Sequence, residues 1–278
     1  MQIQTYTQEV VNLHTHSFYC GHGSGTVSEY VHVAGQKGLK VLGMSEHCPV
    51  PDHRWSRSRM DYSQMDAYER DCSIAKQESP EGLTVLTGYE CDYLDVYKEY
   101  YEEVSDRVDY LICAIHDLSR DSEREFSVFW NPLSKKDLAT YTDLYCQALS
   151  SGLFLFGAHP DLFGYYYPKW DAETEACSRA IIACAVEHNV ALEINANGMR
   201  KRKVQDENGW RYSYPLSPFW ELASEYPLQV VTHSDAHAAT LLKDGYEECS
   251  QIAEDHGLSF CSYQVETGAD GRSSLHLV

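Results

Sequence analysis

Histidines and carboxylates stand directly after short apolar segments at several places in this sequence. His14 and His16 follow the first such segment, and Asp235 and His237 follow the last. Residues i and i+2 of an extended chain point to the same side, so each pair can direct both of its side chains into one cavity. Imidazole and carboxylate groups together suit zinc, iron or manganese. These pairs therefore predict a metal site.

A larger set of metal-ligand residues shares this placement: His14, His16, His22, His47, Glu90, His116, His159, Asp235 and His237. A single histidine is more often a hydrogen-bonded or surface residue, but so many at segment ends are hard to explain by coincidence. The seven histidines and two carboxylates in this set exceed the ligands of one tetrahedral ion. The set therefore predicts two or three divalent ions that share a bridging carboxylate. The other histidines are expected to be structural: His32, His53, His188, His233, His256 and His276.

Polar residues beside these ligands have two interpretations. Glu46 and Asn195 would either orient ligands through hydrogen bonds or satisfy other buried polar groups. The ten cysteines form no CxxC pair, so we expect mostly reduced thiols in the core. Cys20 and Cys48 each lie close to one of these histidines, so either could instead bind metal.

Strand-like and helix-like segments alternate along the chain and would position these residues. Apolar runs of strand character occupy residues 10–13, 40–44, 84–88, 110–114, 153–157, 191–194 and 229–232. Helical spacing occupies residues 27–38 and roughly 61–78, 95–106, 135–151, 172–188, 217–225 and 238–256. This alternation implies parallel strands with helices outside. Seven such units suit a barrel related to the eight-fold one, which carries its active site at the C-terminal strand ends.

Two connections, 116–134 and 197–217, are too long to be simple turns. Long loops in compact domains tend to be functional, and a barrel would put both on its C-terminal face. Since neither a linker nor a low-complexity segment interrupts the sequence, we expect residues 1–278 to form a single domain.

The charge of the chain limits its partners. The formal net charge of −20 and the pI near 4.9 are opposite to those of a protein that binds nucleic-acid phosphates. Bound cations can reverse the field locally, so a small anionic substrate such as a phosphate ester remains compatible with this charge. The N-terminus resembles no signal peptide, and every apolar stretch is too short to cross a bilayer. We expect a soluble, cytoplasmic protein that contacts neither nucleic acid nor membrane.

The motifs HTH…H, SEH, GYE, AIH, GAHPD and SDAH, in this order, resemble the PHP (polymerase and histidinol phosphatase) superfamily over nearly the whole chain. The resemblance implies a distorted (β/α)7 TIM-like barrel with a trinuclear metal site. The implied ligands of the first ion are His14, His16, Glu90 and Asp235. Those of the second are Glu90, His116 and His159, and those of the third are His22, His47 and His237.

Local sequence is similar to the histidinol-phosphate phosphatase branch, which acts in histidine biosynthesis. The similar stretches are residues 18–22, 45–49, 88–93 and 193–201. This implies hydrolysis of a phosphate monoester, in which the metals activate a bridging hydroxide that attacks phosphorus. The sequence departs from the branch after His159, where a basic residue is usual and the first one here is Lys169.

The remaining roles are assigned to groups of candidates. Arg200, with Lys201 or Lys169, would contact the phosphate, although the basic run 200–203 could equally be a solvated surface. The leaving alcohol would be protonated by one of His47, Asp161 and His233. Two alternatives stay open: a PHP-type hydrolase of another small phosphoester, a phosphodiester or a C–N bond, and a non-catalytic module of the same fold. The oligomeric state is not predicted.

Overall fold

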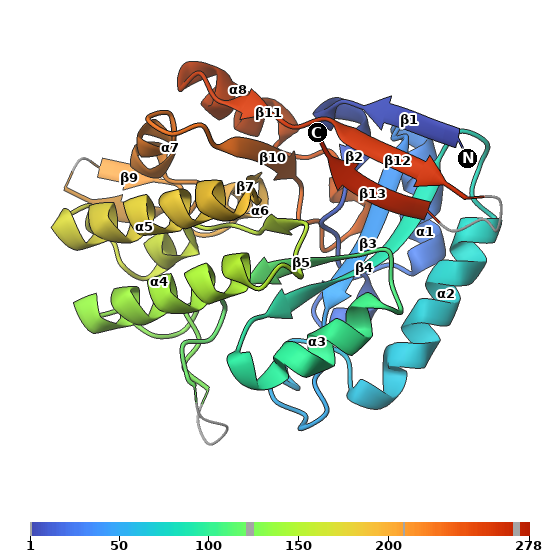
Figure 1. Cartoon of the computed structure of the whole chain (residues 1–278), viewed down its shortest axis with the longest axis horizontal. Helices are drawn as coiled ribbons and strands as arrows, with labels where there is room; N and C mark the ends of the chain where they lie inside the picture. Colours follow the sequence, from blue (N-terminus) through green and yellow to red (C-terminus); the bar gives the residue numbers. More distant parts are fainter. Residues whose placement is uncertain (1, 121–124, 208, 269–272) are drawn as a thin grey trace.

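The computed structural model describes residues 2–120, 125–207, 209–268 and 273–278 (Figure 1). Its main feature is a curled sheet of eight strands, in the order β11-β10-β7-β6-β5-β4-β3-β2. Neighbouring strands of this sheet are parallel throughout. The strands are β2 (Val11–Asn12), β3 (Val41–His47), β4 (Thr84–Asp92), β5 (Tyr110–Ala114), β6 (Phe156–Gly157), β7 (Ala191–Asn195), β10 (Gln229–His233) and β11 (Ser259–Phe260).

The seven strands expected from the apolar runs are all present, and β11 adds an eighth. β3 is buried along its whole length, as a parallel strand covered on both faces should be. β6 is shorter than expected and keeps only Phe156–Gly157 of the run 153–157. The prediction of a parallel α/β barrel-like sheet is therefore confirmed.

The sheet closes where the segments after β2 and β10 meet. Thr15 and Ala236 form a parallel bridge. The amide of His16 donates to the carbonyl of Ala236 at 2.8 Å, and the amide of Ala236 donates to the carbonyl of His14 at 3.3 Å. This closure brings His14 and His16 alongside the segment that carries Asp235.

Helices surround the sheet, as the alternation of segments predicts (Figure 1). In α1, Thr26 and Glu29 form a capping box at the N-terminus, which satisfies otherwise unpaired backbone amides. Gly38 follows α1 with a φ of 74°, a left-handed conformation that glycine adopts without strain. The helices are α1 (Val27–Gln36), α2 (Met65–Gln77), α3 (Lys98–Ser105), α4 (Lys135–Ser150), α5 (Ala172–His188), α6 (Asn197–Arg200), α7 (Ser217–Ala223) and α8 (Tyr246–Asp255).

Buried tyrosines attach the helices to the ends of the strands. Tyr30 in α1 donates to the carbonyl of His16 at 2.6 Å. Tyr68 in α2 donates to Gly88, and Tyr101 in α3 donates to Asp92. Carbonyls near the strand ends must find partners when buried, and these hydroxyls supply them. They thereby fix the backbone next to the residues that carry the predicted chemistry.

A three-stranded antiparallel sheet, in the order β1-β12-β13, lies against the barrel. It consists of β1 (Gln2–Tyr6), β12 (Tyr263–Thr267) and β13 (Ser273–Leu277). Val265 and Leu275 of this sheet share a core cluster with Val11, Val41 and Ala191, each the first residue of its barrel strand. The three-stranded sheet therefore covers the N-terminal ends of the barrel strands.

The long connection after β7 contains regular structure of its own. It begins with α6 and continues into a hairpin of β8 (Val204–Asp206) and β9 (Gly209–Arg211). Neither this hairpin nor the three-stranded sheet is among the elements expected from the sequence. Within the part of the chain that the structure describes, every helix is too short or too polar to cross a bilayer.

Candidate metal centre

The nine predicted ligands, called the ligand cluster below, gather at the C-terminal end of the barrel. They reach it from the ends of six strands and from the turn that carries His22. Two of them, His159 and Asp235, have positive φ values of 30° and 46°. Backbone strain of this kind persists where the surroundings impose it, and it concentrates at functional sites.

Glu90 lies at the middle of the ligand cluster, where it is 1% exposed. His159 Nε2 lies 2.9 Å from its Oε1, and His14 Nε2 lies 3.3 Å from the same oxygen. His47 Nδ1 lies 2.8 Å from Oε2, and His16 Nε2 lies 3.5 Å from it. Each oxygen thus faces a different group of imidazoles, which is the arrangement that a carboxylate shared by two ions requires.

Asp235 presents one oxygen to the imidazoles and has the other held from behind. Oδ1 lies 3.3 Å from His16 Nε2 and 3.8 Å from His14 Nε2. Oδ2 accepts hydrogen bonds from the side-chain amides of Asn195 and Asn197. The amides therefore fix the carboxylate with Oδ1 free to bind an ion.

His22 and His237 face each other through nitrogens that both present lone pairs. Nδ1 of His22 lies 3.0 Å from the carbonyl of Cys20, and Nδ1 of His237 lies 3.1 Å from the carbonyl of Asp235. Since a carbonyl only accepts, each Nδ1 carries the proton and each Nε2 its lone pair. The two Nε2 atoms are 3.0 Å apart, close to the roughly 3.3 Å that separates two ligands of one tetrahedral zinc.

Most of the buried side-chain polar atoms that lack a hydrogen-bond partner among the described residues belong to the ligand cluster. They are His14 Nε2, both ring nitrogens of His16, His47 Nδ1, His159 Nδ1, Glu90 Oε2 and Asp235 Oδ1. Leaving such atoms unpaired is costly, and cations among them would satisfy those that face inward. The donor set therefore fits divalent metal ions.

Candidate ion positions follow from groups of three ligands whose ligand atoms all lie within 4.8 Å of one another. Four such groups consist of cluster residues alone: His14–His16–Asp235, His14–Glu90–His159, His47–Glu90–His116 and His16–His47–His237. Cys20 completes a further triplet with His22 and His237. Its thiol also donates to the carbonyl of Ser17, and burial raises its pKa to about 12.

Electrostatics favours the ligand-competent forms at several positions. Burial is the largest cause that lowers the pKa of His22 and His47 and lowers that of His237 to about 3. At His14, His16 and His116 burial is outweighed by the nearby carboxylates, which raise the pKa, to about 9 for His16. Burial alone would raise the pKa of Glu90, but the surrounding histidines outweigh it and hold the pKa well below its ordinary value. Neutral imidazole and ionised carboxylate are the forms that bind metal.

Buried carboxylates support the imidazoles from behind. Glu193 lies 2.9 Å from His14 Nδ1, and Asp92 lies 3.1 Å from His116 Nδ1. Glu46 lies 3.7 Å from His16 Nδ1 and accepts from the hydroxyl of Ser17. A carboxylate behind a ligating histidine fixes the tautomer and orientation of its ring.

Of these supporting residues, Glu46 and Asn195 are singled out by the sequence, whereas Glu193 and Asp92 are not. The sequence nevertheless contains a feature that could have identified Glu193 and Asp92. Glu193 and Asn195, like Glu90 and Asp92, are two residues apart in largely apolar strands. Such pairs share a face of the strand, so the second member of each pair could have been predicted from the first.

A cavity of about 670 Å³ opens over the ligand cluster. Lys201 lines it, as do Arg57 and the buried Arg59. Arg59 is engaged, since it lies 2.6 Å from Asp92. Aromatic side chains form much of the remaining wall: Trp55, Phe129, Trp130, Tyr165 and Tyr214.

The structure does not bring all the predicted phosphate contacts to this cavity. Lys201 lines it, but Arg200 and Lys169 do not. The guanidinium of Arg200 donates to the carbonyls of Ser234 and Asp244, and Lys169 is exposed elsewhere. Arg57, which the sequence reasoning missed, belongs to the arginine-rich segment that follows β3.

Of the three acid candidates, only His47 lines the cavity. Asp161 is fully buried, accepts hydrogen bonds from the amide of Leu216 and the indole of Trp220, and has its pKa raised to about 7 by burial. His233 lies in the barrel interior between Glu193 and Tyr263. Neither is placed to reach a bound substrate.

Comparisons with known proteins identify the family and the fold. Residues 12–197 match the PHP domain family. The chain is 30% identical over 240 residues to the "Probable histidinol-phosphatase" of Deinococcus radiodurans, covering 81% of this chain and 85% of that protein. It is 26% identical over 262 residues to the "Probable phosphatase YcdX" of Escherichia coli, covering 88% and 84%.

Among solved structures, the fold is similar to that of histidinol phosphate phosphatase from Lactococcus lactis, which was solved with zinc, L-histidinol and phosphate. The TM-score is 0.68 at 16% identity, over 91% of this chain and 95% of that one. At this identity the likeness concerns the fold.

Proposed function

The chain belongs to the PHP domain family, and from this premise we propose that it is a metal-dependent phosphomonoesterase whose substrate is histidinol phosphate. The observation that carries the proposal is the pair of lone-pair-bearing nitrogens on His22 and His237, beside a buried Glu90 that faces imidazoles with both oxygens. This arrangement needs cations. The names of the relatives from Deinococcus radiodurans and Lactococcus lactis support the choice of substrate.

The ligand cluster would hold two to three zinc, iron or manganese ions. His14, His16, Glu90 and Asp235 would hold one ion, Glu90, His116 and His159 a second, and His22, His47 and His237 a third. Bound ions of this kind supply Lewis-acid polarisation of the phosphate and water of lowered pKa.

The side chains around the cavity would bind and orient the substrate. Lys201 and Arg57 line the cavity and would contact the phosphate oxygens, whereas Arg59, which also lines it, is paired with Asp92. Phe129, Trp130 and Tyr165 line the cavity and would contact the organic part of the substrate. A cavity of about 670 Å³ exceeds what phosphate alone needs and is in the usual range for small-molecule sites.

The proton for the leaving oxygen would come from His47 or from solvent. His47 alone among the candidates lines the cavity, but it also belongs to the ligand cluster. Asp161 and His233 are assigned roles inside the protein, because Oδ2 of Asp161 accepts from Leu216 and Trp220 and both ring nitrogens of His233 meet buried partners.

Phosphate release from L-histidinol phosphate by metal-depleted protein, resupplied separately with zinc, manganese or iron, tests the proposal. We expect turnover that depends on metal and that exceeds turnover of other phosphate monoesters. Cleavage confined to phosphodiesters or C–N bonds would contradict the phosphomonoesterase and favour another hydrolase. Inactivity towards every substrate with each metal would favour a non-catalytic module.

A further inference from the structure

A continuous series of buried polar side chains leads from the ligand cluster to the three-stranded sheet. Glu193 Oε1 lies 2.9 Å from His14 Nδ1 and 3.1 Å from His233 Nδ1. The hydroxyl of Tyr263 lies 2.8 Å from His233 Nε2 and 2.7 Å from Gln8 Oε1. All five side chains are at most 4% exposed.

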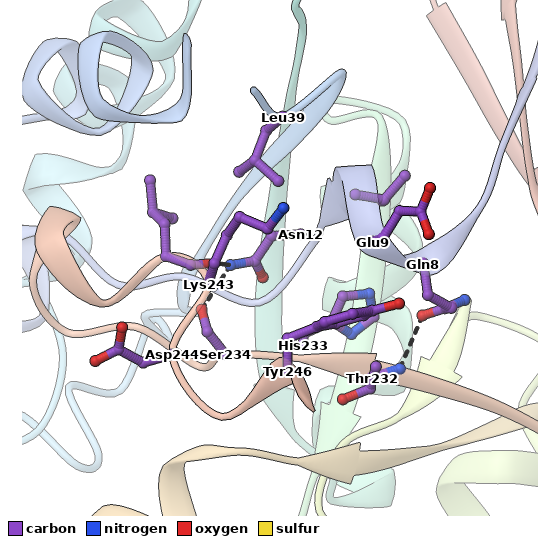
Figure 2. A pocket seen from close by; sticks show the side chains of 12 residues that line it. Gln8, Glu9, Asn12, Leu39, Thr232, His233, Ser234, Lys243, Asp244 and Tyr246 are labelled. Carbon is purple, nitrogen blue, oxygen red and sulfur yellow. Dashed lines mark hydrogen bonds between the residues drawn. The ribbon is translucent and has the colours of Figure 1, made fainter. Parts of the chain in front are cut away.

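Gln8 anchors the far end of this series. Its Nε2 donates to the carbonyl of Cys261 at 2.8 Å, and its Oε1 accepts from the amide of Thr232 at 2.9 Å (Figure 2). Because a backbone amide only donates, the orientation of the Gln8 side-chain amide is determined. The adjoining cavity measures only about 10 Å³, which leaves these side chains little room to move.

The surroundings of this series are apolar. His233 stacks on Phe156 with ring centroids 4.7 Å apart, and Val231, Val265 and Leu275 belong to the same core cluster as Tyr263. Apolar side chains of similar volume would fill such a space at lower cost than buried polar groups. Stability of the core therefore does not explain why polar side chains occupy it.

The connection of these polar side chains to His14 explains why they occupy this space. A ligating imidazole depends on the partner of its other ring nitrogen for its tautomer and orientation, and the partner of His14 is Glu193. Glu193 is in turn shared with His233, whose second nitrogen meets Tyr263. We propose that Tyr263, with Gln8 behind it, is a positioning residue of the metal centre that holds His233 against Glu193 and thereby aligns His14.

This inference rests on the proposed metal centre but not on the identity of the substrate. Gln8 and Tyr263 both lie outside residues 12–197, which match the family. It also gives the three-stranded sheet a part in the metal centre, because Tyr263 is the first residue of β12.

Cobalt(II) binding to the full chain, followed by its absorption spectrum in competition with a chelator, tests the inference. In Tyr263→Phe, we expect one bound ion to be weakened roughly tenfold, as for other losses behind a ligating histidine. The ion at His22, His47 and His237 should keep its affinity. The control is Tyr89→Phe, which removes a hydroxyl that points to Glu69 on α2 and should leave every ion unchanged.

A purely structural role for Tyr263 would lower the thermal stability of the metal-free protein and leave cobalt affinities equal to those of Tyr89→Phe. That result would overturn the inference. Gln8→Met is the second variant, and it should weaken the same ion by a smaller factor, even if Tyr263→Phe does not fold. A wild-type chain that binds no cobalt would contradict the metal centre itself, and this inference with it.

Discussion

At the C-terminal end of the barrel, His14 Nε2, His47 Nδ1 and Asp235 Oδ1 are buried without a hydrogen-bond partner in the described part of the chain. At the N-terminal end, Gln8 and Tyr263 are equally buried, yet each has its polar atoms bonded. Unpaired buried polar groups cost free energy. Their concentration at one end indicates that this end evolved around a ligand, while the apolar core at the other end supplies stability.

The backbone differs between the two ends in the same sense. His159 and Asp235 have positive φ values, which cost free energy in residues other than glycine. The three-stranded sheet, in contrast, pairs in regular antiparallel register. Substitutions at the ligand end should therefore remove activity and keep the fold, whereas substitutions of the apolar residues at the N-terminal end should lower stability and keep activity. Gln8 and Tyr263 are the exceptions at that end, because their side chains connect to His14.

Glu90→Gln should give the largest effect. It preserves the shape of the side chain but removes the charge that faces imidazoles on both sides. We expect turnover to fall by more than the roughly 100-fold that loss of an outer partner can cost, with an unchanged circular dichroism spectrum. Glu69→Gln, in α2 and outside the ligand cluster, is the control. Near-wild-type turnover of Glu90→Gln at saturating metal would show that Glu90 is not shared between ions.

Glu193→Gln should have the next largest effect. The carboxylate of Glu193 accepts hydrogen bonds from the backbone amide of His159 and the side-chain amide of Asn195. Glutamine has an NH2 group in place of one carboxylate oxygen, and this group would face N–H donors instead of accepting from them. We expect zinc affinity and kcat/KM each to fall by about 10–100-fold. Unchanged zinc affinity, measured by competition with a chelator, would show that Glu193 does not support the metal ligands.

Lys201→Ala sharpens the description of the cavity. Loss of a cationic contact to phosphate should lower kcat/KM for the phosphate monoester about tenfold, which corresponds to about 1.4 kcal/mol, and leave the metal content unchanged. Arg200→Lys should affect kcat/KM less, because Arg200 bonds to backbone carbonyls. A larger fall in kcat/KM for Arg200→Lys than for Lys201→Ala would indicate that Arg200, and not Lys201, contacts the phosphate.

Val265→Ala should have the smallest effect on activity. Val265 is buried in β12 among the residues that close the N-terminal end, and truncation should lower the free energy of unfolding by about 2 kcal/mol. Chemical denaturation measures this loss, and kcat/KM measured on the same sample should match the wild type. A parallel loss of kcat/KM would contradict the division of roles between the two ends.

The barrel could be predicted because seven of its eight strands are short apolar runs, each with a helix-like stretch after it, and only β11 lacks this signal. The three-stranded sheet could not. β1 and β13 are only five residues long and contain no continuous apolar run. In addition, Gln2 pairs with Thr267 at the other end of the chain. Local sequence carries little information about a pairing between residues so far apart.

The ligand cluster could be predicted for a related reason. Histidine, aspartate and glutamate residues follow the predicted strands, and the C-terminal ends of parallel strands in a barrel converge on one cavity. The cationic residues of the cavity wall could not, because they lie on loops. Arg200 and Lys201 are neighbours in sequence, yet only Lys201 lines the cavity. The short α6 ends at Arg200, and this loop geometry, which periodicity does not reveal, decides which side chain faces the cavity.

Elemental analysis of purified chain, supplied with zinc, manganese or iron and then freed of loosely bound metal, tests the central claim most directly. We predict two to three ions per chain, and one ion fewer in His237→Ala. Less than one ion per chain in the wild type would contradict the metal centre. So would full retention of metal after combined replacement of His14, His16 and Asp235.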